Sequence, residues 1–139
     1  MDISRRRLSL LLPALTAAAA QRKGQLPSKA YRFEDLSSSA NGPARSWAML
    51  NGETHTGLLL ELHETELPAG LAPHAPHSHV HEEILLIRDG QVEISIAGRK
   101  TTLGTGSAAY LASGEEHGWR NPGSTPAHYF VLAVGRDDA

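Results

Sequence analysis

The 139-residue chain contains no cysteine. It therefore forms no disulfide bonds, and it is not a bacterial lipoprotein, because the lipid of those proteins is attached to a cysteine. The sequence also lacks a basic patch: 13 Lys and Arg stand against 15 Asp and Glu, for a net charge of -2. Since phosphate binding needs a cluster of positive charge, we expect no nucleic-acid partner.

No apolar run is long enough for a membrane-spanning helix, which needs about twenty residues. The best candidate, residues 8–20, is shorter and contains Pro13. A Ser-Arg-Arg-Arg-Leu sequence at residues 4–8, which resembles a twin-arginine export motif, leads into this run, which ends in Ala18-Ala19-Ala20 before Gln21. We therefore expect residues 1–20 to be a cleaved export signal, and the mature protein to be periplasmic or secreted without a membrane anchor. The alternative is a cytoplasmic protein with a basic N-terminus.

Removal of residues 1–20 leaves enough chain for one small domain, with a net charge of about -4. Residues 21–44 are rich in Ser, Gly, Pro and charge, and we interpret them as a tether in which residues 31–33 add an edge strand. The domain itself is expected over residues 45–139.

Short strand-like runs separated by turn signals fill residues 45–139, with little helical periodicity. Hairpin turns are predicted at Asp89-Gly90 and Ala97-Gly98, and another turn at residues 121–123. The pattern predicts an all-β fold, a small antiparallel barrel or jelly roll. The predicted strands are residues 46–50, 54–66, 83–88, 91–97, 100–103, 107–111, 118–120 and 127–134.

Four residues form a constellation typical of a metal site: His77, His79, Glu83 and, thirty-four residues further on, His117. In a β-strand, residues i and i+2 point to one face, so His77 and His79 can both reach one ion. A carboxylate four residues later completes a mixed nitrogen and oxygen set, which suits divalent first-row metals. Three histidines and one carboxylate leave coordination positions open for water, substrate or dioxygen.

A less specific interpretation is that the His-rich tract from His74 to His81 binds metal only adventitiously, as a solvated loop. The tract runs directly into the apolar residues 84–87, which are typical of a buried strand, and this favours a specific site. We expect His74 and His81 to be supporting or surface residues and not ligands.

Two stretches resemble the two sequence motifs of the cupin family. In the first, His77-Ser-His79 is followed by Glu83 and then by Gly90; in the second, Gly106, Gly114, His117 and Asn121 recur at the family's spacing, with Ala112 where proline is usual. The resemblance covers roughly residues 45 to 135. It implies a small cupin jelly roll, also described as a double-stranded β-helix, whose metal ligands are the same four residues.

The resemblance implies an exported, metal-dependent protein that acts on a small oxygenated molecule, as a dioxygenase, an isomerase or a lyase. The alternative is a binding or sensing protein for a sugar or small acid. A divalent transition metal is expected. Manganese or iron is favoured, because a site loaded before export keeps ions that copper or zinc would displace outside, while nickel, copper and zinc stay possible. The expected partner is a second copy of the chain, because single-domain cupins commonly dimerise and residues 84–87 are apolar on both strand faces.

Other polar residues are candidates for a general acid or base, and none stands out. They are His55, Glu61, His63, His81 and His128. Three of them, His55, Glu61 and His63, share a face of the predicted strand 54–66 and either line a cavity or face solvent. We expect His128 to be a hydrogen-bonded core residue. Glu82 is an alternative oxygen ligand to Glu83.

Aromatic residues near the predicted site are assigned by strand parity. Trp119 and Asn121 share a strand face with His117, so Trp119 forms either a wall of the pocket or part of the core. Tyr110 is expected to have a structural role.

Overall fold

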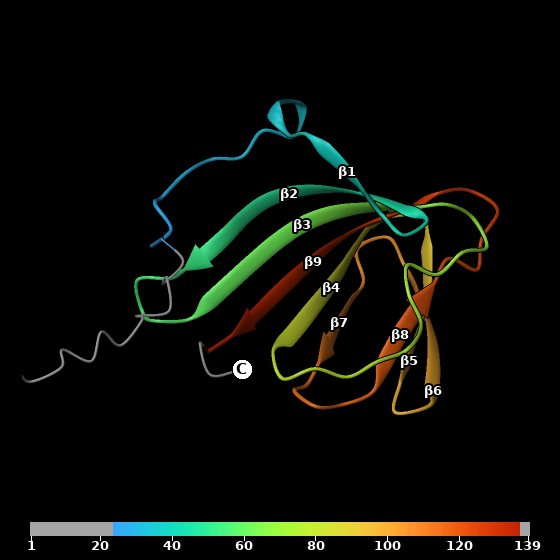
Figure 1. Ribbon diagram of the computed structural model, residues 1–139. Helices are drawn as coiled ribbons and strands as arrows, with labels where there is room; N and C mark the ends of the chain where they lie inside the picture. Colours follow the sequence, from blue (N-terminus) through green and yellow to red (C-terminus); the bar gives the residue numbers. More distant parts are fainter. Residues whose placement is uncertain (1–23, 137–139) are drawn as a thin grey trace, which may run out of the picture.

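The computed structural model describes residues 24–136, which form nine strands and one short 3-10 turn, η1. The elements appear in Figure 1. Their bounds are η1 Phe33–Asp35, β1 Ser38–Asn41, β2 Ala44–Glu53, β3 Leu59–Leu67, β4 Glu82–Asp89, β5 Gln91–Ile96, β6 Arg99–Gly104, β7 Ala108–Leu111, β8 His117–Arg120 and β9 Ala127–Gly135.

The strands make two antiparallel sheets. A six-stranded sheet has the order β1-β2-β3-β9-β4-β7, and a three-stranded sheet has the order β6-β5-β8. The large sheet curves over the small one, so that β9 and β4 face β5 and β8 across the interior (Figure 1). The predicted all-β jelly roll is confirmed.

Alternating side chains explain why these sequences fill the interior. On β9, Ala127, Tyr129 and Val131 are buried, while the residues between them are only partly buried. On β5, Val92 and Ile94 are buried in the same alternation. The period of two places one apolar face of each strand in a common core.

Two predicted features of the strands were wrong. The predicted strand 54–66 is interrupted: β2 ends at Glu53, a turn follows, and β3 begins at Leu59. The turn needs Gly57, whose φ of 83° is in the left-handed region, and the Thr54 hydroxyl accepts a hydrogen bond from the Leu58 amide. Asp89-Gly90 is not a hairpin turn, because β4 and β5 lie in different sheets.

The hairpin predicted at Ala97-Gly98 is confirmed, since Ile96 pairs with Arg99 across it. Both turn residues have positive φ, 47° for Ala97 and 79° for Gly98. This is the backbone that a two-residue hairpin requires to match the twist of its strands.

The segment before β2 lies on the convex face of the large sheet (Figure 1). Its edge strand is β1, residues 38–41, and not residues 31–33, where a 3-10 turn begins instead. The Phe33 ring packs 5.2 Å from Trp47 and lies 5.8 Å below the Arg88 guanidinium, which is paired with buried Glu64 at 2.6 Å. These contacts attach the segment to β2, β3 and β4.

The predicted export signal, residues 1–20, lies outside the described residues. Within residues 24–136, no helix has the length and hydropathy needed to cross a membrane.

Candidate metal centre

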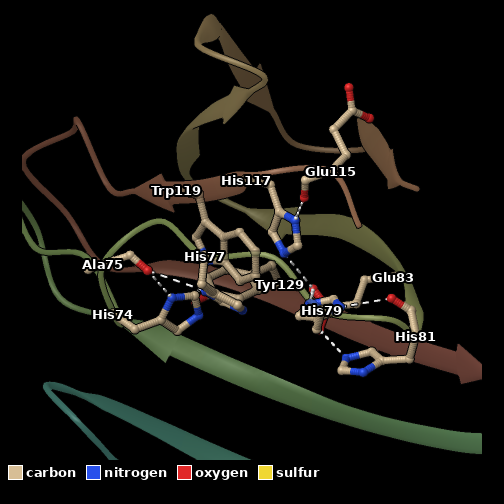
Figure 2. A network of polar contacts seen from close by, with 10 residues as sticks. All are labelled: His74, Ala75, His77, His79, His81, Glu83, Glu115, His117, Trp119 and Tyr129. Atoms are coloured by element: carbon tan, nitrogen blue, oxygen red, sulfur yellow. Dashed lines mark hydrogen bonds and ion pairs between the residues drawn. The ribbon is translucent and has the colours of Figure 1, made fainter. Parts of the chain in front are cut away.

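The four predicted ligands come together from three parts of the fold (Figure 2). His77 and His79 lie in the loop between β3 and β4, Glu83 lies on β4 of the large sheet, and His117 begins β8 of the small sheet. We expected His77 to lie in a regular strand, but it forms only an isolated antiparallel bridge with His117. Two backbone hydrogen bonds of 2.9 Å close this bridge. This bridge fixes the loop against the small sheet.

In each of the three histidines, Nδ1 forms a hydrogen bond with a backbone carbonyl oxygen. His77 Nδ1 lies 3.3 Å from the Ala75 oxygen, His79 Nδ1 lies 2.8 Å from the His81 oxygen, and His117 Nδ1 lies 2.9 Å from the Glu115 oxygen. A carbonyl can only accept, so each Nδ1 carries the proton. In the neutral imidazole the Nε2 lone pair is then free to bind a metal ion.

Two of the three Nε2 atoms, those of His79 and His117, point toward the Glu83 carboxylate. His79 Nε2 and His117 Nε2 lie 3.5 and 3.4 Å from Glu83 Oε2. These three atoms are buried, and none of them has a hydrogen-bond partner. Buried polar atoms without partners are costly, so a group of three that converge on one point requires an explanation.

The donor set fits a divalent transition metal. Ligand atoms bound to one such ion at about 2.1 Å lie roughly 3 to 3.5 Å apart, which matches the Glu83 distances to His79 and His117. The ligating atoms of His77, His79 and His117 lie within 4.8 Å of one another. Three imidazole nitrogens and one carboxylate are the ligands that manganese, iron and their neighbours accept.

Glu82 and Glu83 point to opposite sides of β4. Glu82 accepts a hydrogen bond of 2.6 Å from the Tyr110 hydroxyl, and this bond raises the pKa of Tyr110. Tyr110 is 57% exposed on the convex face, in keeping with the structural role that we expected. Of the two carboxylates, Glu83 is therefore the one that faces the histidines.

His81 lies beside the cluster. Its ring stacks on His79, with centroids 3.6 Å apart, and its Nε2 lies 3.3 Å from Glu83 Oε1. His79, His81 and Glu83 also have ligating atoms within 4.8 Å of one another. In this geometry Glu83 faces His81 with one oxygen and the predicted ligands with the other.

His74 and Trp119 pack around the other side of the site (Figure 2). The His74 ring makes edge contacts with His77 at 4.3 Å and with Trp119 at 5.4 Å. Trp119 lies parallel to His117 and donates from its indole nitrogen to the Tyr129 hydroxyl at 3.0 Å. Trp119 is only 7% exposed, so it supports His117 as part of the core.

Of the remaining candidates from the sequence, His55 and His128 lie away from the cluster, whereas Glu61 and His63 share its face of the large sheet. His55 lies in the turn after β2, where its Nε2 contacts the Leu26 carbonyl at 3.0 Å. The prediction that His128 is a core residue was wrong: it alternates with buried Ala127 and Tyr129, and lies on the convex face 3.8 Å from Glu66. Glu61 and His63 pair opposite Ala133 and Val131, on the concave face that holds Glu83.

A hollow of about 150 Å³ lies next to His81 and Glu61. Two of its residues, Asn51 and Ala133, could not be found from the sequence, because neither belongs to a metal-site pattern; the strand register places them beside Glu61. The hollow is lined by Asn51, Leu59, Leu60, Glu61, His81, Ala133, Val134, Gly135 and Arg136.

A jelly roll with a convergent histidine and carboxylate cluster in its interior defines a class of small β-barrel protein with a metal-type site. The chain belongs to the cupin family: residues 63–134 match the family described as "Cupin domain". No curated protein matches the chain significantly.

Solved structures share the fold at low sequence identity. An RmlC-like cupin from Shewanella frigidimarina is 18% identical with a TM-score of 0.65, and the match covers 80% of this chain and 96% of that one. KdgF from a Halomonas species is 17% identical with a TM-score of 0.67, covering 81% and 98%. A predicted oxalate decarboxylase from Thermotoga maritima is 18% identical with a TM-score of 0.62, covering 76% and 98%. Identities this low show the fold alone.

Proposed function

We propose that this cupin is an exported, metal-dependent enzyme that acts on a small oxygenated molecule, with His77, His79, Glu83 and His117 as the metal ligands. The observation that carries the proposal is the convergence of His79 Nε2, His117 Nε2 and Glu83 Oε2, all buried and without hydrogen-bond partners. A bound ion would satisfy all three atoms, as well as His77.

When bound, a divalent metal would supply Lewis-acid chemistry or the activation of dioxygen. The residues of the chain would position it: the backbone carbonyls fix the imidazole tautomers, and the His77–His117 bridge fixes the loop. The hollow beside His81 is where a substrate would approach the open coordination positions.

Dioxygenase, isomerase and lyase chemistry are all compatible with this arrangement. The similar structures include a predicted oxalate decarboxylase, and one fold can host unrelated reactions. The alternative, binding of a sugar or small acid without turnover, uses the same hollow and differs only in the absence of product.

The ligand set is tested by elemental analysis of protein purified from its native export route. We expect near-stoichiometric manganese or iron in the wild type, and loss of that metal in His117→Ala and Glu83→Gln. Glu82→Gln is the matched control, because Glu82 faces Tyr110 on the other side of β4, and it should keep the metal. Unchanged metal content in His117→Ala would refute the four-ligand assignment.

Oxygen-electrode screening of phenolic substrates then separates the reactions. Oxygen uptake by the loaded protein would establish an oxidoreductase, whereas a loaded metal without uptake would direct the search to isomerases, lyases and binding proteins.

A further inference from the structure

One transverse row of side chains connects the candidate metal centre to Glu61, an acidic residue that the site does not use. Across the large sheet, Asn51 pairs with Glu61, Glu61 pairs with Ala133, and Ala133 pairs with Glu83. Residues paired in this way point to the same face. Glu61 and Glu83 therefore stand on the concave face at either side of Ala133, with Cα atoms about 10 Å apart.

The hollow of about 150 Å³ lies beside this row, with Glu61, His81 and Ala133 in its lining. Glu83 does not line it, but His81, whose Nε2 lies 3.3 Å from Glu83 Oε1, connects the hollow to the candidate metal centre. Glu61 is 48% exposed in its side chain, so it can meet a ligand, and its Oε1 lies 3.4 Å from His63 Nδ1.

Glu61 and His63 also line a second hollow, of about 220 Å³, on the same concave face. Its other lining residues are small or polar and come from the hairpin of β1 and β2: Ser39, Ala40, Asn41, Ser46 and Ala48. The Glu61–His63 pair thus stands between a hollow beside the metal centre and a polar one further along the sheet.

We propose that Glu61 and His63 bind neighbouring hydroxyl groups of a polyhydroxylated substrate, a polyol, sugar or sugar acid, whose reacting end lies over Ala133 toward Glu83. The inference rests on the proposed function and names its substrate class. A carboxylate accepts hydrogen bonds from two adjacent hydroxyls at once, and charge-assisted bonds of this kind are the stronger ones. The imidazole beside it adds a further partner for a hydroxyl.

The test measures binding of two probes to manganese-loaded protein by calorimetry. D-mannitol carries neighbouring hydroxyls and can span the row, whereas oxalate has none and reaches only the metal. Glu61→Gln keeps the shape and removes the charge. We expect it to weaken mannitol binding about tenfold or more while manganese content and oxalate affinity stay unchanged.

A second variant fills the space without touching Glu61. Ala133→Leu should keep its manganese and lose mannitol binding, because the larger side chain would occupy the hollow that Ala133 lines. The matched control is Leu132→Met, which changes the neighbouring residue on the opposite face of β9 and should bind mannitol like the wild type.

The inference is overturned if loaded wild-type protein binds oxalate but not mannitol, or if Glu61→Gln binds mannitol as tightly as the wild type. Neither result affects the proposed metal centre. Absence of manganese from the wild type would instead overturn the proposed function, and the inference with it.

Discussion

Individual hydrogen bonds determine what the histidines of this site can do. Because each Nδ1 of His77, His79 and His117 donates to a carbonyl, the Nε2 atoms are left as acceptors that face inward. His128 does not face the cluster, because its ring lies on the convex face beside Glu66. Histidines in this chain therefore have different roles, because their backbone positions differ.

Tyr129 provides a pH test of the core below the site. Burial raises its pKa to about 12, above the value of about 10 in an unfolded chain. A raised acid pKa favours the folded state while the group is neutral, so this contribution is complete below pH 10 and is lost as the pH rises through 12. We expect urea denaturation to show a fall in the free energy of unfolding over this range that is smaller in Tyr129→Phe.

The same variant has a cost at neutral pH. Tyr129→Phe leaves the buried Trp119 indole nitrogen without an acceptor, which should destabilise the protein by about 1 to 3 kcal/mol at pH 8. An equal pH dependence in wild type and variant would contradict the role given to Tyr129.

The motif spacing predicted that His77, His79, Glu83 and His117 lie in one region of the fold. Strand parity did not position His77, which lies in the loop before β4 and reaches His117 through an isolated bridge. Parity predicted that Glu61 and His63 share a face, but only the register with β9 shows that this is the concave face. It did not extend to His55, because Gly57 ends the strand and removes the common face that we assumed. The hollow could not be predicted, since Ala133 contributes to it by being small.

At the scale of the strands, Gly118 allows β8 and the loop that precedes β4 to approach each other closely, because it has no side chain. A Cβ atom at this position would lie 3.0 Å from Pro76 Cα, one residue before His77. Contact this close explains how the loop reaches the small sheet and forms the His77–His117 bridge.

Gly118→Ala should therefore move the loop without unfolding the protein. We expect metal affinity to fall about tenfold, the size of effect seen when the support of a ligand is disturbed. Gly104→Ala is the matched control, because a Cβ there has no atom within 4 Å. Competition with a chelator measures both variants, and equal affinities would show that the loop position does not depend on Gly118.

Strand connections were harder to predict than strands. A turn sequence such as Asp89-Gly90 fits a hairpin equally well whether the chain returns beside its own strand or passes into the facing sheet. In this fold it passes from β4 into β5 of the small sheet. The choice depends on packing between distant segments, which local turn chemistry does not encode.

For the protein as an assembly, the convex face of β4 and β7 is the surface of interest. Ile84, Leu86 and Tyr110 are 37%, 44% and 57% exposed there, and Ile84 is paired with Tyr110. Exposed apolar side chains grouped on one sheet face are typical of an interface. We propose that two copies of the chain pack through this face, as the sequence led us to expect.

Light scattering coupled to gel filtration tests this proposal. The wild type should have the mass of a dimer, and Leu86→Glu should shift it to a monomer, because a buried, unpaired carboxylate is strongly unfavourable at an apolar interface. Thr101→Glu, on the exposed strand β6, is the control and should leave the mass unchanged. A wild type that elutes as a monomer would contradict the proposal.

The four predicted metal ligands include residues from both sheets of the barrel. The two sheets share no strand, and Glu83 comes from one sheet while His117 comes from the other. An ion bound by both residues would cross-link the two sheets. It would therefore oppose their separation, in addition to any role in catalysis. Metal concentration would then set the heat resistance of the protein, and starvation for the metal would expose the barrel to proteases.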